Sequence, residues 1–313
     1  YDDIKPESGW CAYIKEHLGE TYPFQLLVGN HEEYPSGPNG FIDNFAACLP
    51  DRLNVTGSYA HRYYFDYPPG APLARFVLID PDLNRGGTKA QFCKGGETDN
   101  CGWLQERIDE AKQQGLWTIV GMHKNCLTMG VKSCEIGADL LNMLVDLKVD
   151  LVLQGHDHGY QRSKQLSLTA GCLLVPTDAY NANCVADDGS DGVYKRHMGL
   201  VFAITAVIGR GPYPANPFDT DAPYFAAWMD AAAPSNGVLQ FTVTQDQIDA
   251  EFIPSVGAFS DHFIIGPASA PPTPTPAPTP SPGSTIPPTA SPPPSTNTPE
   301  GETVRLYLPH VIP

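Results

Sequence analysis

The chain has 313 residues, and its hydrophobic fraction of 42% is enough to build a large buried core. Its formal net charge of −16 disfavours general DNA or RNA binding, because an acidic surface repels a polyanion. The longest apolar run, residues 200–209, is too short to cross a bilayer as a helix, so no transmembrane segment is expected.

Apolar runs alternate with amphipathic segments along most of the chain. Strands are expected at residues 24–28, 75–79, 116–120, 149–153, 200–208, 238–243 and 248–253. Helices are expected at residues 103–114 and 138–147, where apolar positions recur at helical spacing. Strands connected by helices predict a layered α/β domain, and the last strands are expected to pair in an antiparallel or mixed way.

The composition changes abruptly after Ile265. Residues 267–299 contain 14 prolines and no charged residue, so this stretch is expected to form an extended, disordered stalk. The sequence thus predicts a domain at 1–265, a Pro/Ser/Thr-rich linker at 266–302 and a short apolar tail at 303–313. A stalk with an apolar end favours attachment to the cell envelope, and a frayed terminus is the alternative.

Eight cysteines are present, and none lies in a Cys-x-x-Cys pattern. Neighbourhood along the chain favours the pairs Cys93–Cys101, Cys126–Cys134 and Cys172–Cys184, which leaves Cys11–Cys48. An even number of cysteines favours an oxidising compartment, so a secreted or cell-surface protein is expected. Eight free thiols in a cytosolic protein are the alternative.

Side chains that can bind metals follow three of the predicted strands directly. In chain order they are Asn30 with His31, His123, and His156 with His158. Because ligand sites in α/β sheets form at the carboxyl ends of strands, these residues are expected to meet in one crevice. A single histidine after a strand is more often a surface residue than a ligand, but three such strand ends together favour a site. Imidazole and amide ligands suit Zn, Fe or Mn better than Mg or Ca.

These motifs resemble those of the calcineurin-like metallophosphoesterases, and of their purple-acid-phosphatase-like branch in particular. The resemblance rests on Gly-Asn-His-Glu at 29–32, Gly-x-His at 121–123 and Gly-His-x-His-Gly-Tyr-Gln-Arg at 155–162, and it covers about residues 1–255. It implies a two-sheet α/β sandwich of the metallophosphoesterase type with helices outside. It also implies an enzyme that hydrolyses small phosphate mono- or diesters through attack by a metal-bound hydroxide.

The resemblance also implies a role for each matching residue. Asn30, His123 and His156 would hold one of two metal ions, which would be Fe, Zn or Mn, and His158 would hold the other. His31 would face the substrate phosphate, where it would stabilise the transition state or protonate the leaving oxygen.

The chain also departs from the family pattern. By the same resemblance, Glu32 would orient His31 or its loop. The family's Asp-x-His/Gly and Gly-Asp motifs, which supply carboxylate ligands, are missing here, as in an N-terminally truncated domain. Tyr1 is expected to match the last residue of the second missing motif, as a metal-binding tyrosine. These departures keep a second function open, namely a non-catalytic, surface-displayed binding protein on a phosphoesterase scaffold.

Other side chains are possible substitutes for the missing ligands. Asp80 follows a predicted strand, but a turn or capping role is favoured for it. His61 is expected at the start of a hairpin, in an aromatic cluster. Lys124 could bind phosphate as a point charge, although solvated lysines are commoner.

Overall fold

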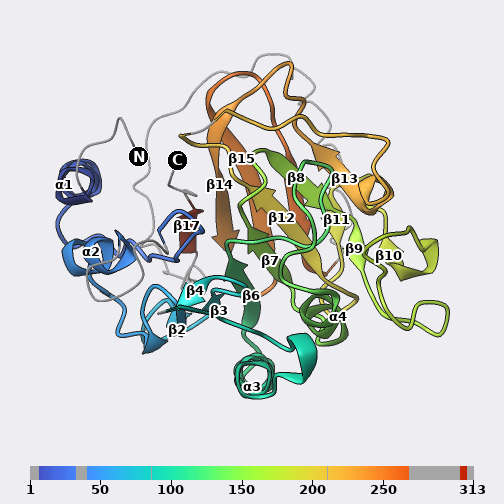
Figure 1. Ribbon diagram of the computed structural model, residues 1–313, viewed down its shortest axis with the longest axis horizontal. Helices are drawn as coiled ribbons and strands as arrows, with labels where there is room; N and C mark the ends of the chain where they lie inside the picture. Colours follow the sequence, from blue (N-terminus) through green and yellow to red (C-terminus); the bar gives the residue numbers. More distant parts are fainter. Residues whose placement is uncertain (1–6, 33–40, 86, 210, 268–303, 309–313) are drawn as a thin grey trace, which may run out of the picture.

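Two sheets form the centre of the molecule. The computed structural model describes residues 7–32, 41–85, 87–209 and 211–267, and the backbone of 304–308 (Figure 1). The larger sheet has eight strands in the order β1-β2-β3-β6-β7-β12-β8-β13. Its strands are β1 (Thr56–Ser58), β2 (Arg62–Tyr67), β3 (Ala74–Ile79), β6 (Trp117–Met122), β7 (Leu151–Gln154), β8 (Tyr160–Ser163), β12 (Val201–Thr205) and β13 (Phe225–Trp228).

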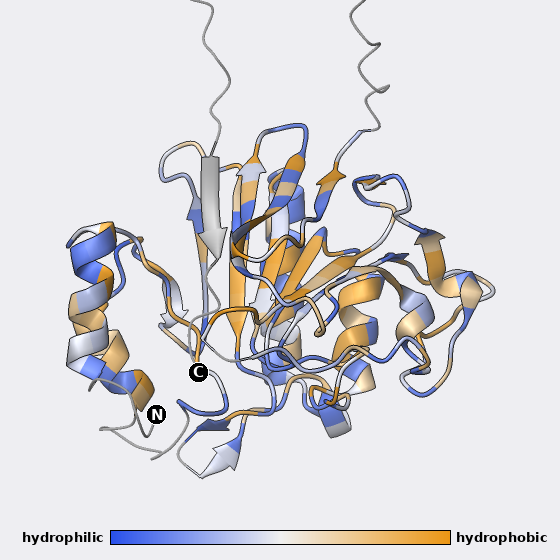
Figure 2. Cartoon of the chain, turned by 90° about the horizontal axis from the view of Figure 1, so that it is seen from above, coloured by the Kyte–Doolittle hydropathy of each residue, from blue (hydrophilic) through white to orange (hydrophobic). Residues whose placement is uncertain are grey.

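The four central strands of this sheet, β3, β6, β7 and β12, run parallel to one another. Every residue of β6, β7 and β12 is buried. Such continuous apolar strands are typical of a parallel sheet that is covered on both faces. Figure 2 shows the same concentration of hydrophobic residues on the central strands.

The second sheet has the order β11-β16-β15-β14-β17 and packs against one face of the larger sheet. Its strands are β11 (Val193–Tyr194), β14 (Asn236–Val243), β15 (Ile248–Val256), β16 (His262–Ile265) and β17 (Val304–Leu308). Strands β14, β15 and β16 pair in an antiparallel way, whereas β11 and β16 are parallel. Of the antiparallel or mixed pairing predicted for the last strands, the sheet as a whole shows the mixed form. Phe76, Trp117, Phe241 and Phe252 belong to the core between the sheets.

Helices α3 (Asp99–Gln113) and α4 (Ala138–Asp146) cover the opposite face of the larger sheet (Figure 1). Leu104 and Ile108 of α3, and Leu140 and Leu144 of α4, are buried there, as the helical spacing predicts. The fold is therefore the α/β sandwich of two sheets with helices outside that the sequence indicated. Short elements complete the loops: β4 (Asn84–Arg85), β5 (Thr88–Lys89), β9 (Gln165–Leu166), β10 (Val185–Asp187), and the 3₁₀ turns Lys94–Gly96, Ala182–Cys184 and Ala222–Tyr224.

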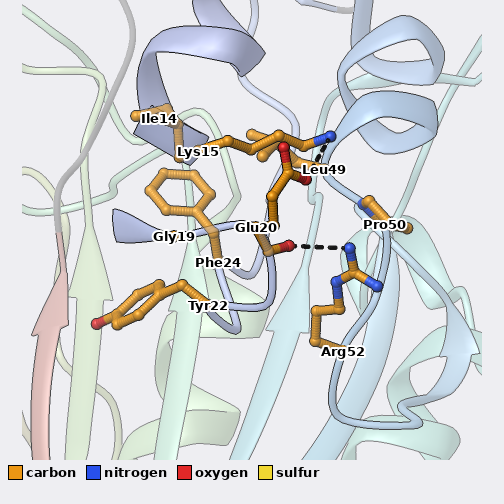
Figure 3. Close-up of a pocket in the computed structure, with 9 residues that line it drawn as sticks. All are labelled: Ile14, Lys15, Gly19, Glu20, Tyr22, Phe24, Leu49, Pro50 and Arg52. Carbon is orange, nitrogen blue, oxygen red and sulfur yellow. Dashed lines mark hydrogen bonds and ion pairs between the residues drawn. The ribbon is translucent and has the colours of Figure 1, made fainter. Parts of the chain in front are cut away.

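Helices α1 (Glu7–Leu18) and α2 (Phe41–Cys48), which the sequence analysis did not predict, form a separate small core. The Trp10 ring of α1 lies edge-on to Phe24 and Phe45, with ring centroids 5.8 and 5.1 Å away. Polar contacts close the turn after α1, where the Glu20 carboxylate pairs with Lys15 at 3.3 Å and its carbonyl accepts from Arg52 at 3.0 Å (Figure 3).

The prediction of a strand at residues 24–28 is wrong, because this segment is not part of either sheet. Leu27 forms only an isolated parallel bridge to Ala60. Tyrosine hydroxyls make further contacts: Tyr59 Oη donates to the Phe24 carbonyl at 3.1 Å, and Tyr63 Oη donates to the Leu26 carbonyl at 2.5 Å. The alternating burial of the segment is that of a strand, but the described chain provides no strand ladder for it to join.

Four disulfides are present, and they are the pairs predicted from the sequence: Cys11–Cys48, Cys93–Cys101, Cys126–Cys134 and Cys172–Cys184. None of the described helices combines the length and the apolar character that a membrane span needs. Most of the predicted 266–302 linker lies outside the described residues. Within the predicted tail, the backbone of β17 pairs with β14 as an edge strand of the second sheet.

Candidate metal centre

Two histidines lie at the carboxyl ends of neighbouring parallel strands. His123 directly follows β6, and His156 follows β7 after Gly155. The Gly155 N–H donates to the His123 carbonyl at 2.9 Å, which connects the two turns. The pairing of β6 with β7 therefore brings together two side chains that are 33 positions apart in the sequence.

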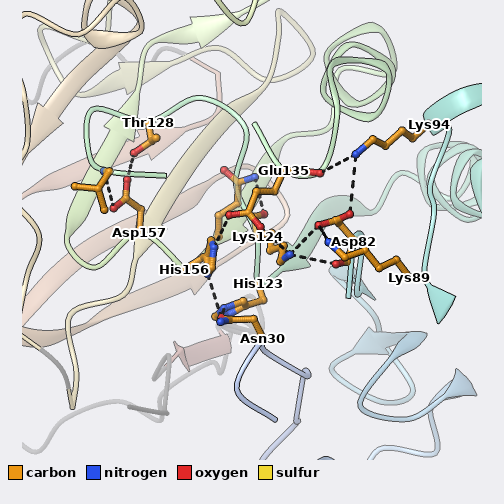
Figure 4. A network of polar contacts seen from close by, with 12 residues as sticks. Asn30, Asp82, Lys89, Lys94, His123, Lys124, Thr128, Glu135, His156 and Asp157 are labelled. Atoms are coloured by element: carbon orange, nitrogen blue, oxygen red, sulfur yellow. Dashed lines mark hydrogen bonds and ion pairs between the residues drawn. The ribbon is translucent and has the colours of Figure 1, made fainter. Parts of the chain in front are cut away.

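Asn30 reaches the same point from the N-terminal segment (Figure 4). Its Oδ1 lies 2.7 Å from His123 Nε2 and 3.1 Å from His156 Nδ1. The two imidazole rings are 5.1 Å apart, centroid to centroid. An amide oxygen and two ring nitrogens thus converge at one point, and this set of donors fits Zn, Fe or Mn.

The turn before Asn30 is closely fitted to this cluster. The Gly29 N–H donates to Glu32 Oε2 at 3.0 Å. A Cβ atom at Gly29 would lie 2.5 Å from Glu32 Oε2 and 3.1 Å from His123 Cε1, so glycine is required at this close approach. Glu32 is buried and closes the 29–32 turn, whereas the His31 side chain is exposed.

His156 is buried and adopts a left-handed backbone conformation with φ of 64°. This conformation is costly for a residue other than glycine, and such residues cluster at functional sites. Burial lowers the pKa of His156 below its ordinary value, although a hydrogen bond to Glu135 opposes the shift, so the ring is neutral near pH 7. A neutral imidazole is the form that binds a metal ion.

His158 follows His156 by two residues in the sequence, and its ring is stacked on Tyr213 with ring centroids 4.3 Å apart. The Tyr213 N–H donates to the His158 carbonyl at 2.7 Å. His123, His156 and His158 all border a cavity of about 120 Å³ that is otherwise lined mainly by apolar side chains. The structure therefore brings the predicted histidines of both motifs to one cavity, while Tyr1 lies outside the described residues.

Three further carboxylates adjoin the histidines or are linked to them, and the sequence patterns assigned no ligand role to any of the three. Glu135 Oε1 lies 2.7 Å from His156 Nε2. Asp157 is fully buried and accepts hydrogen bonds from Thr128 Oγ1 and, at 3.3 Å, from the Val131 N–H. Asp82 is also buried. Asp157 occupies the variable position of the Gly-His-x-His motif, whereas Glu135 and Asp82 belong to no motif, so only the fold reveals the position of these two.

Lys124 is neither a solvated lysine nor a free phosphate-binding charge, because it is buried and paired with two carboxylates. Its Nζ lies 2.8 Å from Asp82 Oδ2 and 2.7 Å from Glu135 Oε2 (Figure 4). Burial of Glu135 opposes its ionisation, but hydrogen bonds from Lys124 and His156 outweigh this and lower its pKa. Asp82 is also paired with Lys89 at 2.8 Å, which extends the network to the protein surface.

The other candidates take structural roles. Asp80 is fully buried at the end of β3, where His61 Nδ1 contacts it at 3.1 Å and Arg85 Nε donates to it at 2.6 Å. His61 lies in the turn of the β1–β2 hairpin, as predicted, but its partner is this carboxylate rather than an aromatic cluster. Within the described ranges, no group of three or more His, Cys, Asp or Glu side chains is placed to hold a metal ion.

Sheet, helices and histidine cluster together define a protein of the layered α/β metallophosphoesterase type. A solved relative, the purple acid phosphatase PPD1 from yellow lupin (Lupinus luteus) seeds, shares this fold. It superimposes with a TM-score of 0.56 and 17% identity over 84% of this chain and 45% of that one. A model of the calcineurin-like phosphoesterase family matches residues 1–160 of the 313. The chain belongs to the calcineurin-like phosphoesterase family.

Curated relatives agree with this assignment. Purple acid phosphatase 23 of Arabidopsis thaliana is 24% identical over 167 residues, which are 50% of this chain and 33% of that protein. The uncharacterized protein Rv2577 of Mycobacterium tuberculosis is 26% identical over 157 residues, 46% of this chain and 28% of that one. The chain thus spans about a third or less of the length of the curated relatives it matches.

Proposed function

We propose that the chain carries the catalytic domain of a secreted hydrolase of phosphate mono- or diesters that works with two metal ions. The convergence of Asn30 Oδ1, His123 Nε2 and His156 Nδ1 carries the proposal. These three residues would hold one ion, which would be Fe, Zn or Mn, and His158 would contribute to the second, with Tyr1 as a further ligand. A bound ion pair polarises the phosphoryl group and lowers the pKa of a water molecule.

The residues of the chain would supply binding, orientation and proton transfer. His31 is exposed next to Asn30, which supports a role for its imidazole in meeting a phosphate ester that approaches from solvent. There it would donate a hydrogen bond to a phosphoryl oxygen or a proton to the leaving oxygen. Glu32 supports this role indirectly, because its bond to the Gly29 N–H fixes the turn that carries His31.

Export from the cytosol is part of the proposal and is supported by the disulfides. Four disulfides are compatible with an oxidising compartment and are unusual in the cytosol. Attachment to the cell envelope through the tail at 303–313 remains a proposal. Pairing of β17 with β14 gives part of that tail a position on the domain itself.

An activity assay on the full chain tests this function. After loading with Zn²⁺, Mn²⁺ or an Fe/Zn mixture, the chain should release p-nitrophenol from p-nitrophenyl phosphate or its diester. His156→Ala should reduce the rate by more than about 100-fold, because even an indirect contact to a metal ligand is worth roughly 10–100-fold. His262→Ala is the matched control, since this exposed histidine pairs with Asp249 away from the site.

The second candidate function is a non-catalytic binding protein on the same scaffold. The observation in its favour is that no acidic residue joins Asn30, His123 and His156 as a direct ligand within the described residues. Zn²⁺ binding with no hydrolysis of either ester under any metal loading would support this candidate and contradict the first.

A further inference from the structure

Glu135 lies on the side of the His156 ring opposite to Asn30. One ring nitrogen of His156, Nε2, is 2.7 Å from Glu135 Oε1, and the other, Nδ1, is 3.1 Å from Asn30 Oδ1. The ring therefore separates Glu135 from the point where the proposed metal ligands meet. Glu135 can act on that point only through His156, and not as a ligand itself.

The position of the Glu135 carboxylate is fixed by several contacts. Its second oxygen, Oε2, pairs with Lys124 Nζ at 2.7 Å. Lys124 is held in turn by the carbonyl and carboxylate oxygens of Asp82, at 3.1 and 2.8 Å. The Glu135 N–H donates to the Asn125 carbonyl at 3.2 Å, and the preceding residue, Cys134, is bonded to Cys126. Each carboxylate oxygen thus has one defined partner.

This arrangement determines which nitrogen of His156 carries the proton. An ionised carboxylate only accepts hydrogen bonds, so the ring must present its N–H at Nε2. The neutral imidazole then has its lone pair on Nδ1, which faces Asn30 Oδ1. His123 Nε2 lies 2.7 Å from the same oxygen. A lone pair at that point is what a metal ligand must provide.

We propose that Glu135 is a positioning residue that holds His156 in the Nε2–H tautomer and so directs Nδ1 towards the metal ion. The role as support for a metal ligand rests on the proposed function, whereas the tautomer itself does not. Outer carboxylates of this kind orient histidine ligands and raise their basicity, and their loss typically weakens metal binding roughly 10–100-fold.

Glu135→Gln gives a specific test, because the Lys124 ammonium can only donate. The glutamine should turn its oxygen to Lys124 and its NH₂ group to His156. His156 Nε2 must then accept, so the proton should move to Nδ1. Long-range ¹H–¹⁵N NMR of the metal-free full chain reads the tautomer, and chelator competition gives the Zn²⁺ affinity. We expect Nε2–H in the wild type, Nδ1–H in the variant, and Zn²⁺ binding weakened about 10–100-fold.

Glu110→Gln is the matched control, because Glu110 also pairs with two cations, Arg75 at 3.0 Å and Arg107 at 3.1 Å, away from the histidines. It should leave both readouts unchanged. An Nδ1–H tautomer in the wild type would overturn the proposal, and this result does not depend on the folding of any variant. A Glu135→Gln variant with the wild-type tautomer and Zn²⁺ affinity would overturn it as well. Failure of the wild type to bind Zn²⁺ contradicts the proposed function instead, and the tautomer still decides what Glu135 does.

Discussion

His123 and His156 follow strands that have a hydrogen-bonded neighbour on each side, whereas Asn30 follows a segment that belongs to neither sheet. Strand β6 lies between β3 and β7, and β7 lies between β6 and β12. Residues 24–28 have one bridge, from Leu27 to Ala60, and side-chain contacts to Tyr59 and Tyr63. The two halves of the proposed metal centre therefore rest on supports of different strength.

This difference indicates how the site would respond to perturbation. Opening of a segment with few backbone hydrogen bonds costs much less free energy than opening of a central strand. Loss of order should therefore begin at residues 24–32 and remove Asn30 and His31 first. The histidines at the sheet would keep their geometry after the N-terminal side has opened. Experiments that weaken one side at a time can measure how far the two are independent.

The largest effect is expected from the Cys126–Cys134 disulfide, which lies on the sheet side of the centre, that is, the side that holds His123 and His156. Replacing Cys126 and Cys134 together by serine frees the loop that leads to Glu135. Closure of a loop of 8 residues contributes about 2.5 kcal/mol to stability in the chain-entropy model. We expect the free energy of unfolding to fall by about this amount in urea denaturation, together with weaker Zn²⁺ binding.

A control for this variant is the double serine replacement of Cys172 and Cys184, which closes a loop of similar length. This pair lies outside the network of Asn30, His156 and Glu135, so it should cost similar stability without a change in Zn²⁺ affinity. Equal Zn²⁺ affinities of the two double variants would show that the Cys126–Cys134 loop does not support the site.

A smaller effect is expected from Tyr59→Phe on the N-terminal side. The Tyr59 hydroxyl contacts the carbonyls of Phe24 at 3.1 Å and Leu49 at 2.9 Å, and its loss should cost about 1–2 kcal/mol. Amide hydrogen exchange should accelerate at residues 24–30 and stay unchanged in β6 and β7. Tyr194→Phe removes a buried hydroxyl that donates to the Ser163 carbonyl, and it should not affect residues 24–30. If Tyr59→Phe accelerated exchange equally at residues 24–30 and in β6 and β7, the two sides of the centre would open together.

The sequence predicted the central part of the fold because local patterns encode it. The apolar runs of β3, β6 and β7 and the helical spacing of Leu104, Ile108 and Ala111 each identify one element. The segment at 24–28 has the same local pattern, but a strand also needs neighbours, and these are defined only by the tertiary structure. Helices α1 and α2 pack on the small core around Phe24 rather than on the sheet, and this partner too is defined only by the tertiary structure.

The same distinction explains what the sequence showed of the site. His123 and His156 follow apolar runs that form neighbouring parallel strands, so their meeting point follows from the direction of those strands. Asn30 also follows an apolar run and a glycine, but it reaches the two histidines from a segment outside both sheets. Glu135 and Asp82 lie in loops without a motif, and they reach Lys124 and His156 only through the folded path of the chain. Lys124 looked solvated for the same reason, because its two carboxylate partners are distant in sequence.

A pH-dependent effect is expected at Asp221, whose carboxylate accepts a hydrogen bond from the Thr128 N–H at 3.2 Å. Burial raises the pKa of Asp221 to about 6. Because the folded pKa exceeds the unfolded value, the stability that protonation of Asp221 provides is complete below about pH 4 and is lost as the pH rises through 6. Asp221→Asn keeps an acceptor for Thr128 without the charge. In thermal melts, the Tm of Asp221→Asn should therefore exceed that of the wild type at pH 8 and equal it at pH 4. A Tm increase of the same size at both pH values would mean that the buried charge is not the cause.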